Sequence, residues 1–286
     1  MKSFALYIKK RIILALTILL FALFFVPFDA MAQGGLLLTP RRVVFEGKQK
    51  TKQITLVNSG QDTSTYYISF VQYRMNEDGS FDRITEPDSG QVFADKYLRL
   101  YPRRVTLAPD EAQVVKVQLR GYNKLPDGEY RSHLYFKLQN NVNALGEEGN
   151  KDTTTISIKL IPIYGISIPA IIRKGKSTTK VNLSDITTTM LNDTTPALNI
   201  TFNRSGNFSV YGDVKVDYFP SDGGEPVEVG IVRGLAVYTP NKLRRFTLPL
   251  DNKFDYKKGK LKVVFTSKSD LKKSVVLAEK EVDLNR

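Results

Sequence analysis

Residues that could carry out catalysis or bind a metal are few in this sequence. The chain of 286 residues has a single histidine, His133, and neither cysteine nor tryptophan. A period of two along the strand places His133 on the face opposite Leu134 and Phe136, which favours a structural role over that of a general base. No second histidine can complete a zinc site, and the carboxylates lack the spacing of a calcium loop. We therefore predict no catalytic residue, no metal and no cofactor, and a protein that is not an enzyme.

A different chemistry, the pairing of backbone with another chain, is suggested by the segment Thr155–Ile168. It is long and rich in β-branched residues, it alternates through Ile156, Ile158 and Leu160, and it then becomes nearly all apolar. At the edge of a sheet, such a strand offers N–H and C=O groups together with apolar side chains to a partner. In the interior of a sheet it would only fill the core. The residues alone leave both interpretations open.

The elements around these residues are all expected to be strands. Segments with a period of two alternate with turn residues such as Asp78-Gly79 and Pro126-Asp127-Gly128, and long helical periodicity is absent after the first 32 residues. Strands are expected in the first half at 36–45, 53–58, 66–73, 113–120, 130–138 and 155–168. In the second half they are expected at 180–183, 197–202, 211–218, 227–238, 244–250, 260–267 and 275–284.

This spacing of short strands is typical of immunoglobulin-like sandwiches. We predict an all-β chain with two immunoglobulin-like β-sandwich domains, over residues 33–169 and 170–286. The junction Pro169–Lys176 has no long polar linker. The two domains are therefore expected to be set at an angle, with a cleft between them.

Residues 1–32 have the three parts of a secretory signal peptide. Four cations come first, an apolar run follows over Ile12–Phe28, and Ala30-Met31-Ala32 provides a small-x-small cleavage site. An uncleaved membrane anchor is the alternative, which the cleavage site disfavours. We predict export of the chain, with membrane contact only through this segment before cleavage.

The formal net charge of +13 favours acidic partners such as anionic glycans or an acidic protein. The cations are nevertheless scattered, and they form no runs longer than pairs such as Arg41-Arg42 and Arg103-Arg104. A solvated basic surface is therefore favoured, and no nucleic-acid partner is expected.

Three stretches of the first half resemble the periplasmic pilus-assembly chaperones of the PapD type. The stretches are Pro40–Gly47 with Gln53–Asn58, Tyr101–Glu111 leading into Val114–Leu119, and Leu125–Ser132 before Leu134-Tyr135-Phe136. They are similar to the family's first two strands, to its proline-rich entry into a central strand, and to its Leu-Pro entry into the following strand. In the second stretch Asp110 stands where the family usually has glycine. The resemblance covers most of residues 36–168, whereas the second half matches only in class.

The resemblance implies a site as well as a fold. In that family, an arginine early in the first strand and a lysine in the last strand of the first domain bind the client's terminal carboxylate in the cleft. Arg42 matches the arginine by position. Lys159 matches the local context of the lysine, while counting back from Pro169 places Tyr164 there instead, and both remain open.

The function that the resemblance implies is that of a periplasmic chaperone. It would bind and stabilise exported, pilin-like subunits of pili or fimbriae by donating a β-strand, without a small-molecule cofactor. Arg42 and Lys159 would bind the client's carboxylate, and Ile156, Ile158 and Leu160 would contact the client's strand. The alternative is a structural or adhesive envelope protein that binds glycan or another surface component.

Overall fold

The computed structural model describes residues 35–47, 49–139, 164–268 and 274–284. The signal peptide expected over 1–32 lies outside these ranges, as do the predicted site residues Ile156, Ile158, Lys159 and Leu160. Within the described ranges, no helix is long and apolar enough to cross a membrane.

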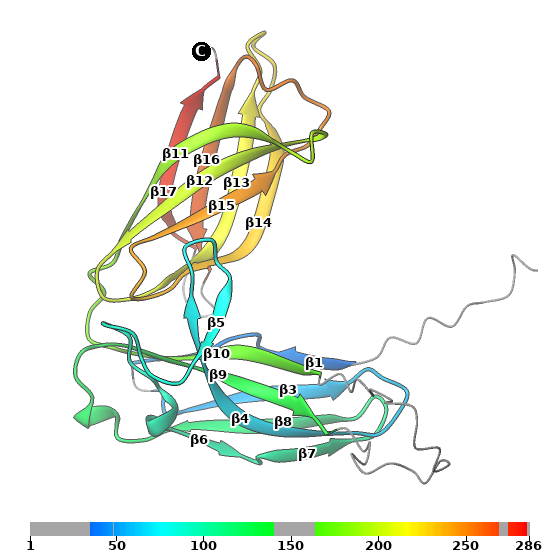
Figure 1. Cartoon of the computed structure of the whole chain (residues 1–286), viewed down its shortest axis with the longest axis vertical. Coiled ribbons are helices and arrows are strands. Elements are labelled where there is room, and N and C mark those ends of the chain that lie inside the picture. Colours follow the sequence, from blue (N-terminus) through cyan, green and yellow to red (C-terminus); the bar gives the residue numbers. More distant parts are fainter. Residues whose placement is uncertain (1–34, 48, 140–163, 269–273, 285–286) are drawn as a thin grey trace, which may run out of the picture. The chain divides into compact units, whose positions relative to one another are not determined.

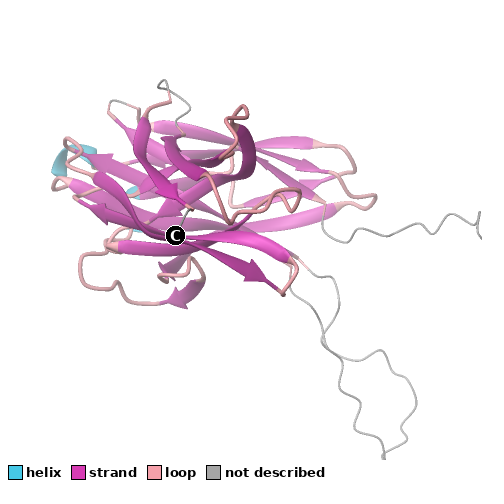
Figure 2. Cartoon of the chain, turned by 90° about the horizontal axis from the view of Figure 1, so that it is seen from above, coloured by secondary structure: helices cyan, strands magenta, loops and turns pink. Residues whose placement is uncertain are grey.

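The described residues form strands and two single-turn 3₁₀ helices, η1 (Asp95–Tyr97) and η2 (Tyr122–Lys124), which confirms the prediction of an all-β chain (Figure 2). The strands are β1 (Leu36–Thr39), β2 (Val43–Glu46), β3 (Thr51–Asn58), β4 (Ser64–Met75), β5 (Phe81–Ile84), β6 (Leu98–Tyr101), β7 (Arg104–Leu107), β8 (Ala112–Leu119), β9 (Gly128–Leu138), β10 (Gly165–Lys174), β11 (Lys180–Leu191), β12 (Thr195–Ser205), β13 (Val210–Phe219), β14 (Val227–Val237), β15 (Leu243–Pro249), β16 (Lys260–Ser267) and β17 (Val276–Asp283).

Strands β1 to β10 form the first sandwich. One sheet has the order β1-β3-β8-β6, and the other has the order β2-β10-β9-β4-β5 with β7 also paired to β4 (Figure 1). The connections from β3 to β4 and from β8 to β9 cross between the two sheets, as in an immunoglobulin-like Greek key.

Two prolines mark the places where the chain changes sheets within the first sandwich. Pro40 separates β1, which pairs with β3, from β2, which pairs with β10. Pro102 separates β6, which pairs with β8, from β7, which pairs with β4. Because proline has no N–H to donate, the ladder of one sheet ends there and the chain can join the other.

The core of the first sandwich comes from alternate residues of its strands. In β3, Ile54 and Leu56 are buried while Gln53 is exposed, and in β9 both Leu134 and Phe136 are fully buried. This is the alternation expected of strands that have one face on the core. The sequence pattern therefore fixes which face of each sheet points inward.

Strands β11 to β17 form the second sandwich, from the sheets β11-β12-β15 and β14-β13-β16-β17. Its core contains Phe202 of β12 and Phe265 of β16, whose rings meet edge to face with 5.2 Å between centroids. Each sheet contributes one of the two rings, so the contact spans the interior of the sandwich. The prediction of two immunoglobulin-like sandwiches is confirmed.

Strand β10 differs from its expected range. The expected strand stopped at Ile168, and a domain boundary was placed after Pro169, yet β10 pairs with β9 as far as the partners Lys174 and Gly128. Pro169 does not end the strand because Ile171 and Ile172, just after it, are fully buried and continue the ladder. The division into domains at residues 169 and 170 stays a prediction.

Candidate functional site

Strand β10 is paired along both edges in only part of its length. On one side β9 pairs with the whole strand, whereas β2 pairs with Ala170–Arg173 alone, in parallel. Residues Gly165–Pro169 have β9 on one side and, among the strands that the structure describes, no partner on the other. About 17 Å of strand edge is therefore open to another chain at roughly 3.3 Å per residue.

The side chains along this open edge change from buried to exposed. Ile168 is buried in the core, while Ile166, on the same face two residues earlier, is 38% exposed. Tyr164 comes next on that face and is 41% exposed, and its carbonyl oxygen accepts a hydrogen bond from the N–H of Leu138 at 3.0 Å. The apolar side chains of β10 itself thus become exposed toward the beginning of the strand.

A groove of about 1180 Å³ begins where β2 joins β10, and we call it the basic groove. Its lining comes from β2 and the approach to it, from β3, from the chain between β10 and β11, from the start of β13, from the end of β16 and from the start of β17. The described lining contains one carboxylate, Glu46, and seven cations, which are Arg41, Arg42, Lys52, Arg173, Lys176, Lys180 and Lys268. Such an excess of positive charge attracts anions to the groove.

Arg42 lies in the basic groove immediately before β2. Its guanidinium carbon is 3.9 Å from the centroid of the Tyr211 ring, and its Nε is buried without a hydrogen-bond partner in the described part of the chain. Burial lowers the pKa of Arg42, but an arginine keeps its charge in proteins. A buried donor without a partner is costly, so an anion placed here would satisfy it.

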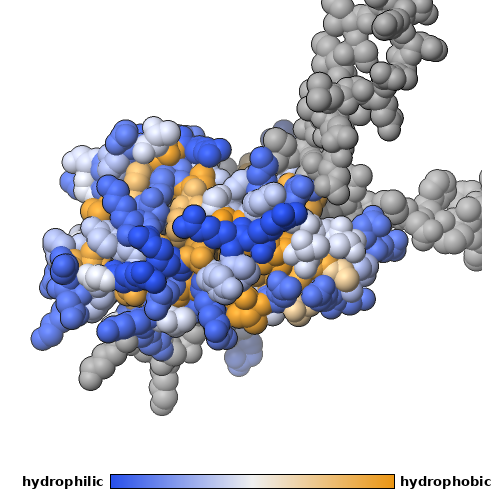
Figure 3. Space-filling view, turned by 90° about the horizontal axis from the view of Figure 1, so that it is seen from below, coloured by the Kyte–Doolittle hydropathy of each residue, from blue (hydrophilic) through white to orange (hydrophobic). Residues whose placement is uncertain are grey.

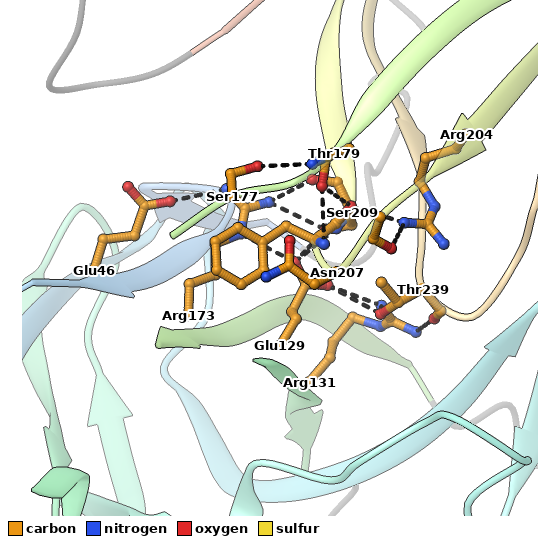
Figure 4. Close-up of polar contacts among 12 residues, drawn as sticks. Glu46, Glu129, Arg131, Arg173, Ser177, Thr179, Arg204, Asn207, Ser209 and Thr239 are labelled. Atoms are coloured by element: carbon orange, nitrogen blue, oxygen red, sulfur yellow. Dashed lines mark hydrogen bonds and ion pairs between the residues drawn. The ribbon is translucent and has the colours of Figure 1, made fainter. Parts of the chain in front are cut away.

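Arg173, by contrast, is fully engaged (Figure 4). Its Nη1 is 2.8 Å from Glu46, its Nε is 3.0 Å from Glu129, and its Nη2 donates to the carbonyl oxygen of Ser209 at 2.7 Å. The bond to Ser209 joins the first sandwich to the residue just before β13. Arg173 therefore builds the wall of the groove and has little capacity left for a ligand.

Glu129 is the buried centre of this polar network (Figure 4). Its carboxylate accepts hydrogen bonds from Arg173, from the N–H and hydroxyl of Ser209 at 2.9 and 2.7 Å, and from Arg131 at 3.3 Å. Burial alone would raise the pKa of Glu129, but the charges of Arg173 and Arg131 hold it below its ordinary value. The buried carboxylate is thus ionised and fully paired.

His133 has the structural position that its sequence context predicted. It lies outside the core on the far face of β9, edge to face with Tyr73 at 5.0 Å and with Phe81 at 5.9 Å. Burial, together with the nearby charge of Arg131, lowers the pKa of His133 to about 3, so the ring is neutral. Its Nδ1 is buried without a partner among the described residues. Within those residues, no group of three or more metal-binding side chains comes together.

The structure places only part of the predicted site. Arg42 lies in the basic groove, while Lys159 and the apolar residues Ile156, Ile158 and Leu160 lie outside the described ranges. The role of Arg42 and the choice between Lys159 and Tyr164 as its companion both stay predictions.

Sequence reasoning did not identify the other cations of the groove or the network around Glu129. The signal for the network was slight. Glu129 and Arg131 occupy alternate positions of one strand, but their partners come from residues far along the chain.

Comparisons with known proteins find likeness only among solved structures. No family model matches the chain, and no curated protein matches it either. The YadV chaperone is 13% identical with a TM-score of 0.46, and the match covers 88% of this chain and all of that one.

Two further structures are similar over most of this chain. The E. coli chaperone DraB is 12% identical with a TM-score of 0.41, over 87% of this chain and 96% of its own. The CupB2 chaperone of Pseudomonas aeruginosa is 12% identical with a TM-score of 0.39, over 86% of this chain and 98% of its own. All three of these solved structures are chaperones, each 12% or 13% identical to this chain.

Proposed function

We propose that this chain is a periplasmic chaperone that binds exported, pilin-like subunits of pili or fimbriae along β10. The observation that carries the proposal is the edge of β10 that stays open over Gly165–Pro169 and ends beside Arg42 and the basic groove. An open edge supplies backbone partners, and an adjacent unpaired cation supplies a partner for a chain terminus.

The direction of β2 indicates how a client would lie. β2 runs parallel to β10 and begins at Val43, opposite Ala170. A client strand in line with β2 and parallel to it would occupy Gly165–Pro169 and end just before β2. Its terminal carboxylate would then lie beside the guanidinium of Arg42, where charge-assisted hydrogen bonds can form.

The apolar part of the site extends beyond the described strand in this proposal. Ile156, Ile158 and Leu160 occupy the same alternate positions in the sequence as Ile166 and Ile168. We assign them as the side chains that fill the incomplete core of the client, with Lys159 or Tyr164 as the companion of Arg42. Each buried aliphatic side chain stabilises the complex by about 1.5–3 kcal/mol and each net hydrogen bond by about 0.5–1.5 kcal/mol. Several of these together exceed the entropic cost of association.

Co-purification with a client tests the proposal. The chain is co-expressed with the pilin-like subunit encoded nearest to its own gene, and the complex is isolated from the periplasmic fraction. Arg42→Ala removes charge-assisted hydrogen bonds of about 1.5–3 kcal/mol, so the complex should be about 10- to 150-fold weaker. Ile166→Asp and Ile158→Asp place a charge on the apolar side of the donated strand and should abolish the complex.

Arg233→Ala is the matched control, because Arg233 is exposed on β14 and does not line the groove. It should retain the client. Unchanged retention by Arg42→Ala and both aspartate variants, each shown to be folded by circular dichroism, would reject the proposal.

A further inference from the structure

Arg42 lies in the basic groove without a carboxylate to hold its guanidinium. It forms no ion pair with any residue that the structure describes, and its buried Nε has no hydrogen-bond partner among them. Arg173 of the same groove, by contrast, is held by Glu46 and Glu129. An arginine side chain has many rotamers, so a guanidinium without such partners stays in one place only if packing restrains it.

The restraint on Arg42 comes from an aromatic ring of the second sandwich. Its guanidinium carbon lies 3.9 Å from the centroid of the Tyr211 ring, over the face of that ring, and both residues line the basic groove. A cation within about 6 Å of an aromatic centroid is attracted to the face of the ring. The ring carbons accept no conventional hydrogen bond from the guanidinium. Tyr211 therefore holds Arg42 while its N–H donors remain available for a carboxylate.

Tyr211 is itself fixed by its surroundings. It lies in β13, where it is the register partner of Ala236 in β14, and its side chain packs against the cluster of Met75, Ala236 and Tyr238. Gly234 approaches the ring closely, since a Cβ at that glycine would lie 2.8 Å from the hydroxyl oxygen of Tyr211. The ring thus has little room to move, and it provides a rigid support for the guanidinium.

We infer that Tyr211 positions Arg42 for the terminal carboxylate of the client, so that the second sandwich contributes to a binding site whose charge comes from the first. This inference rests on the proposed function, because it takes the client terminus to lie at Arg42. Tyr211 is a positioning residue, since it acts on the client through Arg42. A carboxylate in its place would also hold Arg42, but it would occupy the donors that the client needs. A guanidinium that is held in advance loses less conformational freedom on binding.

Titration calorimetry with two peptides tests the inference on the purified protein. Both have the sequence of the C-terminal strand of the pilin-like subunit encoded nearest to the gene of this chain. One ends in a free carboxylate and the other in an amide. Tyr211→Leu removes the ring and should weaken binding of the free-carboxylate peptide about 2- to 30-fold, as expected for the loss of a cation–π interaction. Binding of the amidated peptide should not change. Tyr211→Phe keeps the ring and should bind both peptides as wild-type protein does.

A double-mutant cycle shows whether Tyr211 acts through Arg42. If it does, Arg42→Ala/Tyr211→Leu should bind the free-carboxylate peptide no more weakly than Arg42→Ala alone, whereas independent effects would add. Additive losses of affinity overturn the inference. So does a Tyr211→Leu variant that weakens binding of the amidated peptide as much as that of the free-carboxylate peptide.

Tyr67→Leu is the matched control, because it removes another tyrosine ring that lies beneath an arginine. The guanidinium carbon of Arg104 is 5.5 Å from the centroid of the Tyr67 ring, and neither residue lines the basic groove. This variant should bind both peptides as wild-type protein does. Circular dichroism shows whether each variant is folded.

Nuclear magnetic resonance tests the contact itself, without a client. The Nε–H signal of Arg42 is identified by its loss in Arg42→Ala. The ring current of Tyr211 should displace this signal in wild-type protein, and Tyr211→Leu should move it to the position of an arginine without an aromatic neighbour. An unchanged signal in Tyr211→Leu would show that the ring does not hold the guanidinium, which also overturns the inference.

The amidated peptide separates this inference from the proposed function. If amidation and Arg42→Ala both weaken binding while Tyr211→Leu does not, only the role of Tyr211 is wrong. If neither amidation nor Arg42→Ala changes binding, capture of the carboxylate by Arg42 is wrong, and the inference fails with it. Failure of the free-carboxylate peptide to bind wild-type protein rejects both.

Discussion

At the scale of single residues, the wall of the basic groove depends on one row of charges across three strands. Arg173 of β10 is the register partner of Glu46 in β2 and of Glu129 in β9. Its guanidinium therefore lies between two carboxylates and bonds both. The row is acidic, basic, acidic, and the buried member, Glu129, depends on its partners to remain ionised.

Glu129→Gln should be strongly destabilising, since it leaves Arg131 buried without its carboxylate partner and removes the buried partner of Arg173. The expected loss is about 3–5 kcal/mol in the free energy of unfolding, measured by urea denaturation at neutral pH. Glu228→Gln, which alters a largely exposed carboxylate of β14, should change the stability by less than about 0.5 kcal/mol. A small effect of Glu129→Gln would show that the network contributes little to stability.

The pH dependence of the free energy of unfolding provides a second test of Glu129→Gln. The pKa of Glu129 is lower in the folded chain than its unfolded value of about 4.3. Its contribution to stability is therefore complete above that value and is lost as the pH falls through the folded pKa. Wild-type protein should lose more stability than Glu129→Gln on acidification below about pH 4.3, so the two stabilities should converge.

At the scale of elements, the β4–β5 hairpin holds the first sandwich to β15 and the loop before it. The N–H of Arg245 donates to the carbonyl oxygen of Glu77 at 2.7 Å, and the side-chain amide of Asn241 donates to the carbonyl oxygen of Met75 at 2.7 Å. The side chains of Glu77 and Arg245 form an ion pair. The turn of this hairpin contains Gly79, which has a φ of +88° beside the guanidinium of Arg244.

Gly79→Ala should loosen this attachment. A Cβ at this position destabilises the left-handed backbone conformation, and with it the folded state, by about 1–2 kcal/mol. It also displaces Arg244, whose Nη1 donates to the carbonyl oxygen of Ala236 at 2.6 Å, at about 0.5–1.5 kcal/mol more. Urea denaturation should show a larger loss than for Gly121→Ala, where φ is +68° and a Cβ meets nothing within 4 Å. Equal losses of stability in Gly79→Ala and Gly121→Ala would mean that the side chain of Arg244 moves aside without a cost in free energy.

The sequence predicts strands whose apolar residues alternate regularly better than short or irregular ones, and of the 12 residues of β11 it predicted only 180–183. Strands β3 and β9 were predicted because their apolar residues alternate over many positions. Strands β5, β6 and β7 were missed, since each has four residues and their exposed positions carry charges such as Asp82 and Arg99. Four residues give too few repeats of a period of two to be recognised.

The same contrast holds for the site. Arg42 could be proposed from the sequence because it lies within a recognisable motif next to an apolar strand, and the structure places it in the basic groove while its role stays a prediction. The partnership of Arg173 with Glu129 could not be assigned, because it requires the register of β10 on β9 and joins residues 44 positions apart. Lys176 and Lys180 join the groove only through the fold of the chain that follows β10.

On the scale of the whole molecule, hydrophobic residues do not form a continuous patch on the face seen in Figure 3, where hydrophilic residues separate them. The two sandwiches are joined by a small apolar cluster, in which Met75 packs with Ala236 and Tyr238, and by polar contacts. Arg131 donates to the carbonyl oxygen of Thr239 at 2.6 Å, and Arg173 donates to that of Ser209 at 2.7 Å. These contacts are buried or partly buried, and they couple the stability of the two sandwiches.

Calorimetry should therefore detect one cooperative unfolding transition, with equal van't Hoff and calorimetric enthalpies, although chains with two sandwiches often unfold in steps. Glu129→Gln should lower the midpoint of this transition by weakening the contacts with Ser209 and Thr239. Two well-separated transitions in wild-type protein would contradict this coupling.

The short strand β2 has a further consequence for any chain that pairs with β10. Because β2 already occupies the edge from Ala170 onward, a bound strand cannot slide past Pro169. If the terminal carboxylate of that strand also binds Arg42, as we propose, its last residue is fixed, and with it the identity of every side chain that faces inward, since a shift of one residue exchanges the two faces of a strand. Clients should consequently share a fixed spacing between their carboxyl terminus and their inward-facing apolar residues, however much their sequences differ elsewhere.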